Sequence, residues 1–201
     1  MNVVLEMPKT EVFQNGQVLN ARLISVEKYD QMIEHGILTA ADRVELLNGV
    51  IIEKMPKGTK HAFLNDTIAD LLKEKLGGRV YVRSQNPIVL DDFSEPEPDI
   101  VLAQPPRQIY LEKHPRAKDI LLIIEISDST LGRDRFAKGF AYSKAGISQY
   151  LVVNVAENSV ENYRQPSANG YNSKQTFHKG ESFSLEAFPE IEIEVTSLLP
   201  E

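Results

Sequence analysis

The apolar run Ile120-Leu121-Leu122-Ile123-Ile124 constrains the fold of this chain more than any other feature. A short, almost wholly apolar segment of this kind is typical of a strand that is buried on both faces. Residues 130–145 predict a helix that ends at Gly146, and residues 150–153 predict a second buried strand. Strand–helix–strand connections are crossovers, so we expect the strands at 120–126 and 150–153 to form a parallel pair.

The N-terminal half adds a helix, a hairpin and a second helix. Ser25 can cap a helix that runs to about His35 and stops at Gly36. Asn48-Gly49 separates two β-rich runs, residues 43–47 and 50–55, and this dipeptide is the strongest short hairpin signal because both turn residues need positive φ. A longer helix is expected from Thr59 to Gly77-Gly78.

The remaining segments complete a mixed sheet. We expect a strand at 80–90 with an edge or bulge at Pro87, a short strand at 99–103, a long loop at 104–119, a strand at 160–164 and short strands near Thr176 and Ile193. The fold class is therefore α/β or α+β, with a mixed β-sheet flanked by helices. Residues 1–22 lack periodicity and are expected to form a loose arm, followed by a single domain at 23–201.

Composition narrows the classes of function. The chain of 201 residues has no cysteine, which excludes disulfides, thiolate catalysis and cysteine-based metal sites. No signal peptide or membrane-length apolar run is found, so we expect a soluble, cytoplasmic protein without a membrane partner. A net charge of −7 argues against a non-specific DNA coat, although a metal-dependent nuclease must itself concentrate carboxylates.

Glu125 carries the most chemical information because it ends the apolar run. An unpaired carboxylate there costs several kcal/mol, so it must be paired, protonated, metal-bound or open to water at the strand end. Pro98-Asp99 opens another short strand, and strand ends are where sites collect. Two carboxylates from adjacent strands can hold Mg²⁺, which prefers oxygen ligands and keeps several waters. We expect Asp99 and Glu125 to be those ligands.

These residues form part of a longer pattern. It resembles the Pro-Asp…(Asp/Glu)-x-Lys signature of restriction-endonuclease-like folds, except that Ser127 stands where the signature lysine belongs. Over about residues 25–165 the chain is similar to the Uma2 family of restriction-endonuclease-like proteins, formerly a domain of unknown function. The matching residues are Pro98-Asp99, Glu125-Ile126-Ser127-Asp128-Ser129-Thr130, Asp134, Lys138, Tyr142, Gly146 and Gln149-Tyr150-Leu151-Val152-Val153, with Glu45, Gly49 and His61 upstream.

The resemblance implies a catalytic set around one metal ion. Asp99 and Glu125 would bind Mg²⁺ or Mn²⁺, with the Ile126 carbonyl as a further ligand, and Lys138 would replace the missing signature lysine. The alternative for Lys138 is an exposed helix lysine paired with Asp134.

Five further residues have open roles in this expected site. Glu45 is a third acidic candidate or an outward strand residue, and His61 is a water or phosphate contact or a surface histidine without a role. Tyr142 braces the lysine or only packs. Ser127 and Ser129 are phosphate or supporting contacts, and Ser129 or Thr130 caps the helix.

The expected function is a metal-dependent endonuclease that hydrolyses DNA and acts as a homodimer, as is common in this fold. Two alternatives stay open: a catalytically inactive module that binds DNA or protein, and a phosphodiesterase for small molecules. The sequence has no phosphate-binding P-loop and no dinucleotide fingerprint, so no organic cofactor is expected.

Overall fold

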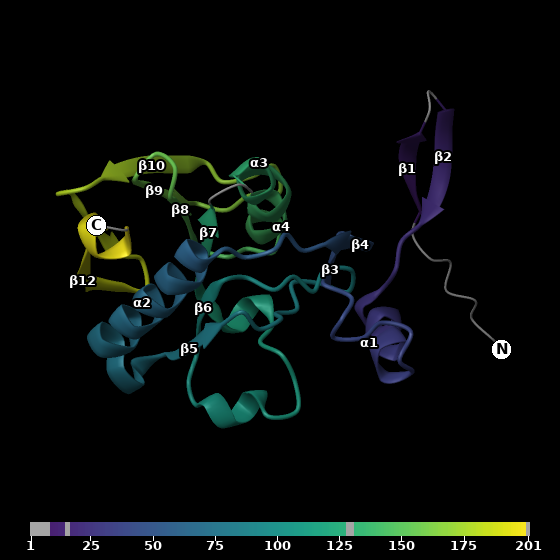
Figure 1. Ribbon diagram of the computed structural model, residues 1–201, viewed down its shortest axis with the longest axis horizontal. Coiled ribbons are helices and arrows are strands. Elements are labelled where there is room, and N and C mark those ends of the chain that lie inside the picture. Colours follow the sequence, from purple (N-terminus) through teal and green to yellow (C-terminus); the bar gives the residue numbers. More distant parts are fainter. Residues whose placement is uncertain (1–8, 15–16, 128–130, 200–201) are drawn as a thin grey trace.

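The computed structural model describes residues 9–14, 17–127 and 131–199, and its centre is a six-stranded mixed sheet (Figure 1). The strand order is β10-β9-β8-β7-β6-β5, and β7 and β8 run parallel while every other pair in this sheet is antiparallel. This confirms the predicted crossover. The strands are β5 (Tyr81–Ser84), β6 (Ile100–Ala103), β7 (Ile120–Ser127), β8 (Gln149–Asn154), β9 (Ser159–Arg164) and β10 (Ser173–His178).

Helices cover both faces of this sheet, which explains why its central strands are apolar throughout. Helix α2 (Thr59–Leu76) packs on one face, where its buried leucines meet Leu122 and Ile124. A second helical segment packs on the other face, where Tyr142 meets Ile123 and Tyr150. Successive side chains of a strand point to opposite faces, so β7 supplies both cores and needs an apolar residue at almost every position. Each large side chain buried in this way contributes roughly 1.5–3 kcal/mol.

The second helical segment is not the regular helix predicted for 130–145. It consists of α3 (Leu131–Arg133), a π-helical turn at Asp134–Lys138 and α4 (Gly139–Lys144), and Gly146 ends it at φ +81° as expected. The Tyr150 hydroxyl donates to the Asp134 carbonyl across 3.0 Å, so the turn is held against the sheet. A π turn changes the direction of the side chains around it, and here both of its end residues, Asp134 and Lys138, are buried.

A smaller layer beside the sheet holds helix α1 (Val26–Glu34) and the hairpin of β3 (Val44–Leu47) and β4 (Val50–Glu53). Asn48 and Gly49 have φ values of +51° and +77°, which confirms the predicted turn. A Cβ atom at Gly49 would lie 2.5 Å from the Leu23 Cβ, so this close approach requires glycine. Leu46 and Glu95 exchange two backbone hydrogen bonds, which fix the loop at 91–97 to the hairpin.

Four further segments differ from their predictions. The strand expected at 80–90 ends at Ser84, because Gln85 turns the chain out of the sheet at φ +53°. The loop at 104–119 contains 3₁₀ turns at Arg107–Tyr110 and Ala117–Asp119. Near the C-terminus, β11 (Ser182–Leu185) pairs with β12 (Phe188–Glu194), and only the second of these strands was predicted.

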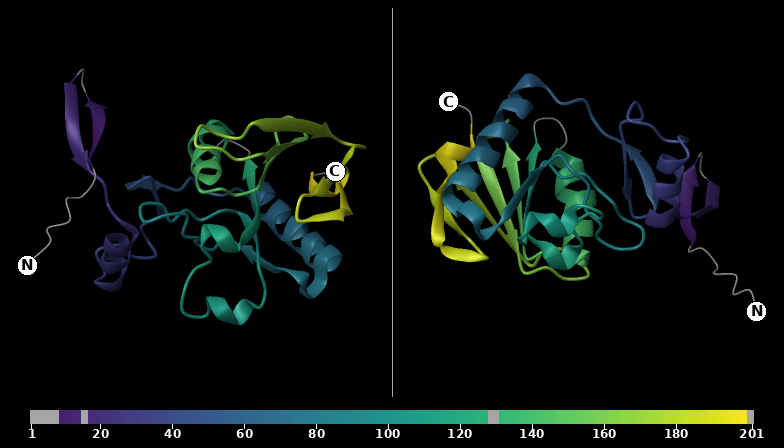
Figure 2. Two further views of the ribbon diagram at one scale, coloured as in Figure 1. Left: turned by 180° about the vertical axis from the view of Figure 1, so that it is seen from behind. Right: turned by 90° about the horizontal axis from the view of Figure 1, so that it is seen from below.

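The fourth difference is at residues 1–22, which were expected to form a loose arm. Within it, β1 (Lys9–Gln14) and β2 (Gln17–Arg22) form an antiparallel hairpin that stands away from the sheet (Figure 2). In the part of the chain that the structure describes, no helix is both long and apolar enough to cross a membrane.

Candidate active site

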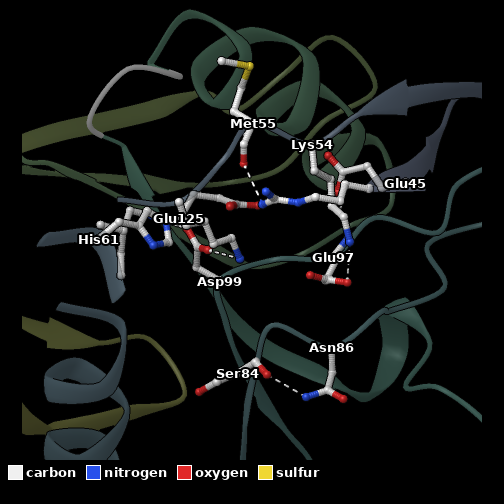
Figure 3. Close-up of polar contacts among 12 residues, drawn as sticks. Glu45, Lys54, Met55, His61, Ser84, Asn86, Glu97, Asp99 and Glu125 are labelled. Atoms are coloured by element: carbon white, nitrogen blue, oxygen red, sulfur yellow. Dashed lines mark hydrogen bonds and ion pairs between the residues drawn. The ribbon is translucent and has the colours of Figure 1, made fainter. Parts of the chain in front are cut away.

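The pairing of β6 with β7 brings the two predicted carboxylates together. Ile100 lies opposite Ile124 in this antiparallel pair, so Asp99 lies opposite Glu125 and both side chains project to the same face. Both residues are buried. Asp99 Oδ2 accepts hydrogen bonds from the Ile126 backbone N–H across 2.8 Å and from His61 Nε2 across 2.9 Å. Figure 3 shows His61 beside Asp99.

Asp99 is held in its ionised form by cationic and hydrogen-bonding neighbours. Burial alone would raise the pKa of Asp99, but the hydrogen bond and charge of His61 lower it. The Lys57 ammonium, 3.2 Å from Asp99 Oδ1, and the Ile126 N–H lower it further, so the net pKa lies below its usual range. His61 is therefore not a surface histidine without contacts, since its side chain is 11% exposed and pairs with Asp99.

Glu125 is held by two donors on a single oxygen. The Lys138 ammonium lies 2.9 Å from Glu125 Oε1, and the Tyr142 hydroxyl donates to the same oxygen across 2.6 Å. Among the described residues, no donor contacts Oε2. Burial raises the pKa of Glu125 to about 8 against the opposing charge of Lys138. One oxygen of this carboxylate is thus fixed, while its negative charge remains only partly compensated.

Lys138 is buried and points at Glu125, so the alternative of an exposed helix lysine is wrong. Its ammonium also lies 3.5 Å from Glu45 Oε1. Burial alone would lower the pKa of Lys138, but the two carboxylates outweigh it and raise the pKa above its ordinary value. Lys138 is therefore a permanent positive charge at this position. Tyr142 is buried, and its hydroxyl donates a hydrogen bond to the Glu125 carboxylate rather than contacting the lysine.

The Glu45 side chain points into the protein and is not the outward strand residue of the alternative prediction. The residue is 2% exposed, and its Oε2 accepts a hydrogen bond from the Glu97 backbone N–H across 2.9 Å. Its Oε1 is buried and has no hydrogen-bond partner in the described part of the chain. Strand β3 is buried on both sides at this point because the 91–97 loop covers it, which the expected in–out alternation of a hairpin does not anticipate.

These groups line one small cavity at the end of β7. Five carboxyl groups and three lysines line this cavity, so acidic side chains outnumber lysines by two. Throughout the described ranges, no three side chains of His, Asp or Glu are arranged as a complete metal centre. Two carboxylates suffice for a hydrated Mg²⁺, however. The lining residues are Glu45, Lys54, Met55, Pro56, Lys57, Gly58, His61, Glu97, Asp99, Glu125, Ile126, Asp134 and Lys138.

The remaining predicted residues lie at or beyond the edge of this cavity. Ile126 lines it, and its N–H contacts Asp99. Ser127 is buried on the same strand face as Glu125 but is not among the lining residues. Ser129 and Thr130, the predicted helix caps, lie outside the described residues.

Four charged residues of the cavity have no place in the sequence-based site: Lys54, Lys57, Glu97 and Asp134. Lys57 and Glu97 come from the segments on either side of the hairpin layer, and Asp134 from the π turn. Asp134 matches the family pattern, but the expected helix would only pair it with Lys138. A signal for Glu97 existed in its position two residues before Asp99, whereas nothing in the sequence points to Lys57.

Comparison with known proteins identifies the family and the fold of this chain. The model of the Uma2 family, described as "Putative restriction endonuclease", matches residues 26–196. A solved structure from Anabaena variabilis ATCC 29413, described as "a putative nuclease belonging to DUF820", superposes with a TM-score of 0.66 at 17% identity. The match covers 87% of this chain and 97% of that one, which shows a shared fold. No curated protein matches the chain. The extent of the family match, over most of the chain, shows that this protein belongs to the Uma2 family.

Proposed function

We propose that this protein is a metal-dependent endonuclease that hydrolyses phosphodiester bonds in DNA. The observation that carries the proposal is the convergence of Asp99, Glu125 and Lys138 in one cavity of a chain that belongs to the Uma2 family. In the family's wider signature a lysine follows the second carboxylate by two residues, and here Lys138 reaches that carboxylate from the π turn instead.

The donor set fits a hydrated divalent cation. Asp99 and Glu125 would hold Mg²⁺ or Mn²⁺, with Glu45 and the Ile126 carbonyl as further oxygen donors. Three features favour a cation at this point: the surplus of carboxyl groups over lysines, the absence of a donor to Glu125 Oε2 among the described residues, and Glu45 Oε1, which has an ion pair with Lys138 at 3.5 Å but no hydrogen bond within those residues. When bound, such an ion lowers the pKa of a coordinated water and offsets charge on phosphate oxygens.

The chain's own residues supply positioning and positive charge. Lys138 stays protonated, so it would stabilise negative charge on the scissile phosphate and would not act as a base. Tyr142 fixes one oxygen of Glu125 and so orients the carboxylate. Lys54 and Lys57 stand at the cavity with their side chains 23% and 26% exposed, where they can contact backbone phosphates. Because Lys138 points at Glu125, catalysis is favoured over an inactive binding module.

A plasmid-cleavage assay with Mg²⁺ or Mn²⁺ tests the proposal. Wild type should convert supercoiled plasmid to nicked and linear forms, and EDTA should stop it. Asp99→Asn, Glu125→Gln and Lys138→Met should each abolish cleavage while their circular dichroism spectra match that of wild type. Glu192→Gln, an exposed substitution on β12, is the matched control and should cut normally. Absence of cutting by wild type on plasmid, linear and single-stranded substrates would overturn the proposal.

A further inference from the structure

A second and larger cavity adjoins the carboxylate site. It has a volume of about 580 Å³ and lies between α1, the β3–β4 hairpin and the segments around Pro87 and Glu95. The two cavities adjoin, since Glu45, Lys54, Lys57 and Glu97 line both of them. A nucleic acid with a phosphate at Asp99 and Glu125 would therefore have its neighbouring groups close to the second cavity.

The walls of this cavity are partly apolar and partly charged, and the charged side chains are four acidic and three basic ones: Asp42, Glu45, Glu95, Glu97, Arg43, Lys54 and Lys57. Tyr29 and Ile33 of α1, with Leu38 and Pro87, form the apolar part. The Tyr29 hydroxyl donates to the Val44 carbonyl across 3.3 Å, which fixes the ring against the hairpin. A volume of this size is far larger than a metal ion needs, and it falls within the range of roughly 300–1,000 Å³ that is typical of organic-ligand sites.

Glu95 gives the cavity its chemical specificity. The residue is only 5% exposed and lines the cavity, yet within the described ranges its carboxyl contacts no hydrogen-bond donor and no cation. Burial, with a contribution from Asp30, raises its pKa to about 7. A buried carboxyl without partners is costly, and a ligand that offers N–H groups would remove that cost. Phosphate would instead add a second anion beside Glu95, whereas the metal proposed for the first cavity would offset the charge of a phosphate there.

We propose that this second cavity binds an unpaired nucleobase of the nucleic acid, with Tyr29 against the face of the base and Glu95 accepting its N–H groups. The inference rests on the proposed nuclease function, since it names what lies next to the scissile phosphate. A base inside an intact duplex is stacked and paired and cannot enter such a recess. The substrate is therefore single-stranded at this position, or its base is extruded from the helix.

The acceptor character of Glu95 favours particular bases. A carboxylate accepts two hydrogen bonds side by side, and guanine presents adjacent N1–H and N2–H donors on its Watson–Crick edge. Adenine presents an amino donor beside an acceptor, which suits an amide better than a carboxylate. Guanine is therefore the expected base, and Glu95→Gln should reduce its advantage over adenine.

Calorimetric titration with mononucleotides tests the inference without any cleavage. The probes are deoxyguanosine 5′-monophosphate, deoxyadenosine 5′-monophosphate and 1,2-dideoxyribose 5-phosphate, which lacks a base, each titrated into the full chain with Mg²⁺. Wild type should bind the guanine nucleotide about tenfold more tightly than the baseless phosphate, as expected for one stacked and hydrogen-bonded base. It should also bind it more tightly than the adenine nucleotide.

Two variants and a control complete the test. Glu95→Gln keeps the shape, removes a buried charge and should bring the guanine and adenine nucleotides within about twofold of each other. Ala40→Trp places a ring at the cavity wall and should abolish the advantage of any base. Glu192→Gln should behave as wild type. Thermal melting checks that all variants fold.

Equal affinity of wild type for the guanine nucleotide and the baseless phosphate would overturn the inference, as would an unchanged guanine preference in folded Glu95→Gln. Plasmid cleavage is scored separately. A protein that cuts DNA but shows no base contribution keeps the nuclease function and loses the base site. A protein that binds the guanine nucleotide through Glu95 but never cuts keeps the base site and loses the nuclease function.

Discussion

Glu125 and Glu161 are two buried glutamates in the same row of the sheet, and their surroundings differ in kind. Val152 of β8 pairs with Glu125 on one side and with Glu161 of β9 on the other, so all three side chains share one face. Glu161 accepts two hydrogen bonds from Arg135, of 2.9 and 2.5 Å. Lys174 donates a third, and the Tyr163 hydroxyl a fourth, each across 2.7 Å. Among the described residues, Glu125 has two donors, Lys138 and Tyr142, and both contact the same oxygen.

The pKa values of the two carboxyl groups are shifted in opposite directions. Burial alone would raise the pKa of Glu161, but hydrogen bonds from Arg135, Lys174 and Tyr163 bring it below its ordinary value. At Glu125, burial prevails over Lys138 and raises the pKa to about 8. A carboxylate with full compensation is a structural link between strands, whereas one with incomplete compensation attracts a further cation. The comparison teaches that burial does not distinguish these two carboxyl groups, whereas the number of their described donors does.

The largest expected effect comes from removing each carboxylate in turn. Glu125→Gln should lower plasmid cleavage by about 10³-fold or more, because a metal ligand is lost, while the protein stays folded. Glu161→Gln should leave cleavage within about threefold of wild type but lower the free energy of unfolding by about 1–2 kcal/mol. Cleavage rates and urea unfolding of the two variants give the measurement. Equal losses of cleavage in both would remove the distinction between them.

Substitutions of the lysines that contact the two glutamates, Lys138 and Lys174, should differ in the same way. Lys138→Met should lower cleavage by about 10²–10³-fold, because a buried charge beside the phosphate position is lost. Lys174→Met should leave the cleavage rate unchanged and should alter the free energy of unfolding by no more than about 1 kcal/mol. The reason is that the Lys174 side chain is 43% exposed and Glu161 keeps its hydrogen bonds to Arg135. Single-turnover cleavage rates check both. Full activity of Lys138→Met would leave the metal site intact and remove the role of the lysine.

The two phenols offer a finer comparison. Tyr142→Phe should lower the maximal cleavage rate by about tenfold at saturating metal, because Glu125 loses the donor that orients it. Tyr163→Phe removes one of several donors to Glu161 and should leave the rate unchanged. Rates measured over a range of Mg²⁺ concentrations separate orientation from metal affinity. An unchanged rate in Tyr142→Phe would mean that Lys138 alone positions the carboxylate.

The smallest effect is the dependence of stability on pH, and its sign differs between Glu161 and the unpartnered Glu95. The folded pKa of Glu161 is lowered, so its stabilisation is present above the unfolded pKa and is lost as the pH falls. The folded pKa of Glu95 is raised from 4.5 to about 7, so its ionisation weakens the fold as the pH rises through that range.

Denaturant titrations in EDTA from pH 4 to pH 8 measure both. At pH 7, wild type should have a larger free energy of unfolding than Glu161→Gln, and this difference should disappear in acid. As the pH rises, the free energy of unfolding of Glu95→Gln should increase relative to that of wild type by about 1 kcal/mol after solvent screening. Parallel curves for all three proteins would contradict the difference in compensation.

Much of the fold follows from local patterns in the sequence. The apolar run of β7 predicts a strand buried on both faces, and Asn48-Gly49 predicts the hairpin because both residues need positive φ. The π turn could not be predicted, since a period close to 3.6 describes a regular helix equally well over 130–145. The outward path of the chain after Ser84 depends on Gln85 at positive φ, a conformation that its residue type does not require.

The site residues at strand ends could be predicted from the sequence, whereas those in loops could not. Asp99 and Glu125 follow from the pairing of adjacent strand ends. Glu95 and Glu97 reach the cavities because the hairpin holds the 91–97 loop through Leu46, a long-range contact without a sequence pattern. Lys57 reaches them from the segment between β4 and α2, which has no sequence signal either. The metal, the DNA substrate and the homodimer remain predictions.

A titration with Mn²⁺ tests the central claim most directly, because the account depends on a cation held by Asp99 and Glu125. Calorimetry on wild type should detect a Mn²⁺ site that Asp99→Asn and Glu125→Gln each abolish and that Glu161→Gln retains with unchanged affinity. Mn²⁺ binding that survives in folded Asp99→Asn and Glu125→Gln would contradict the account, because the metal would then lie elsewhere and the two carboxylates would serve the fold alone.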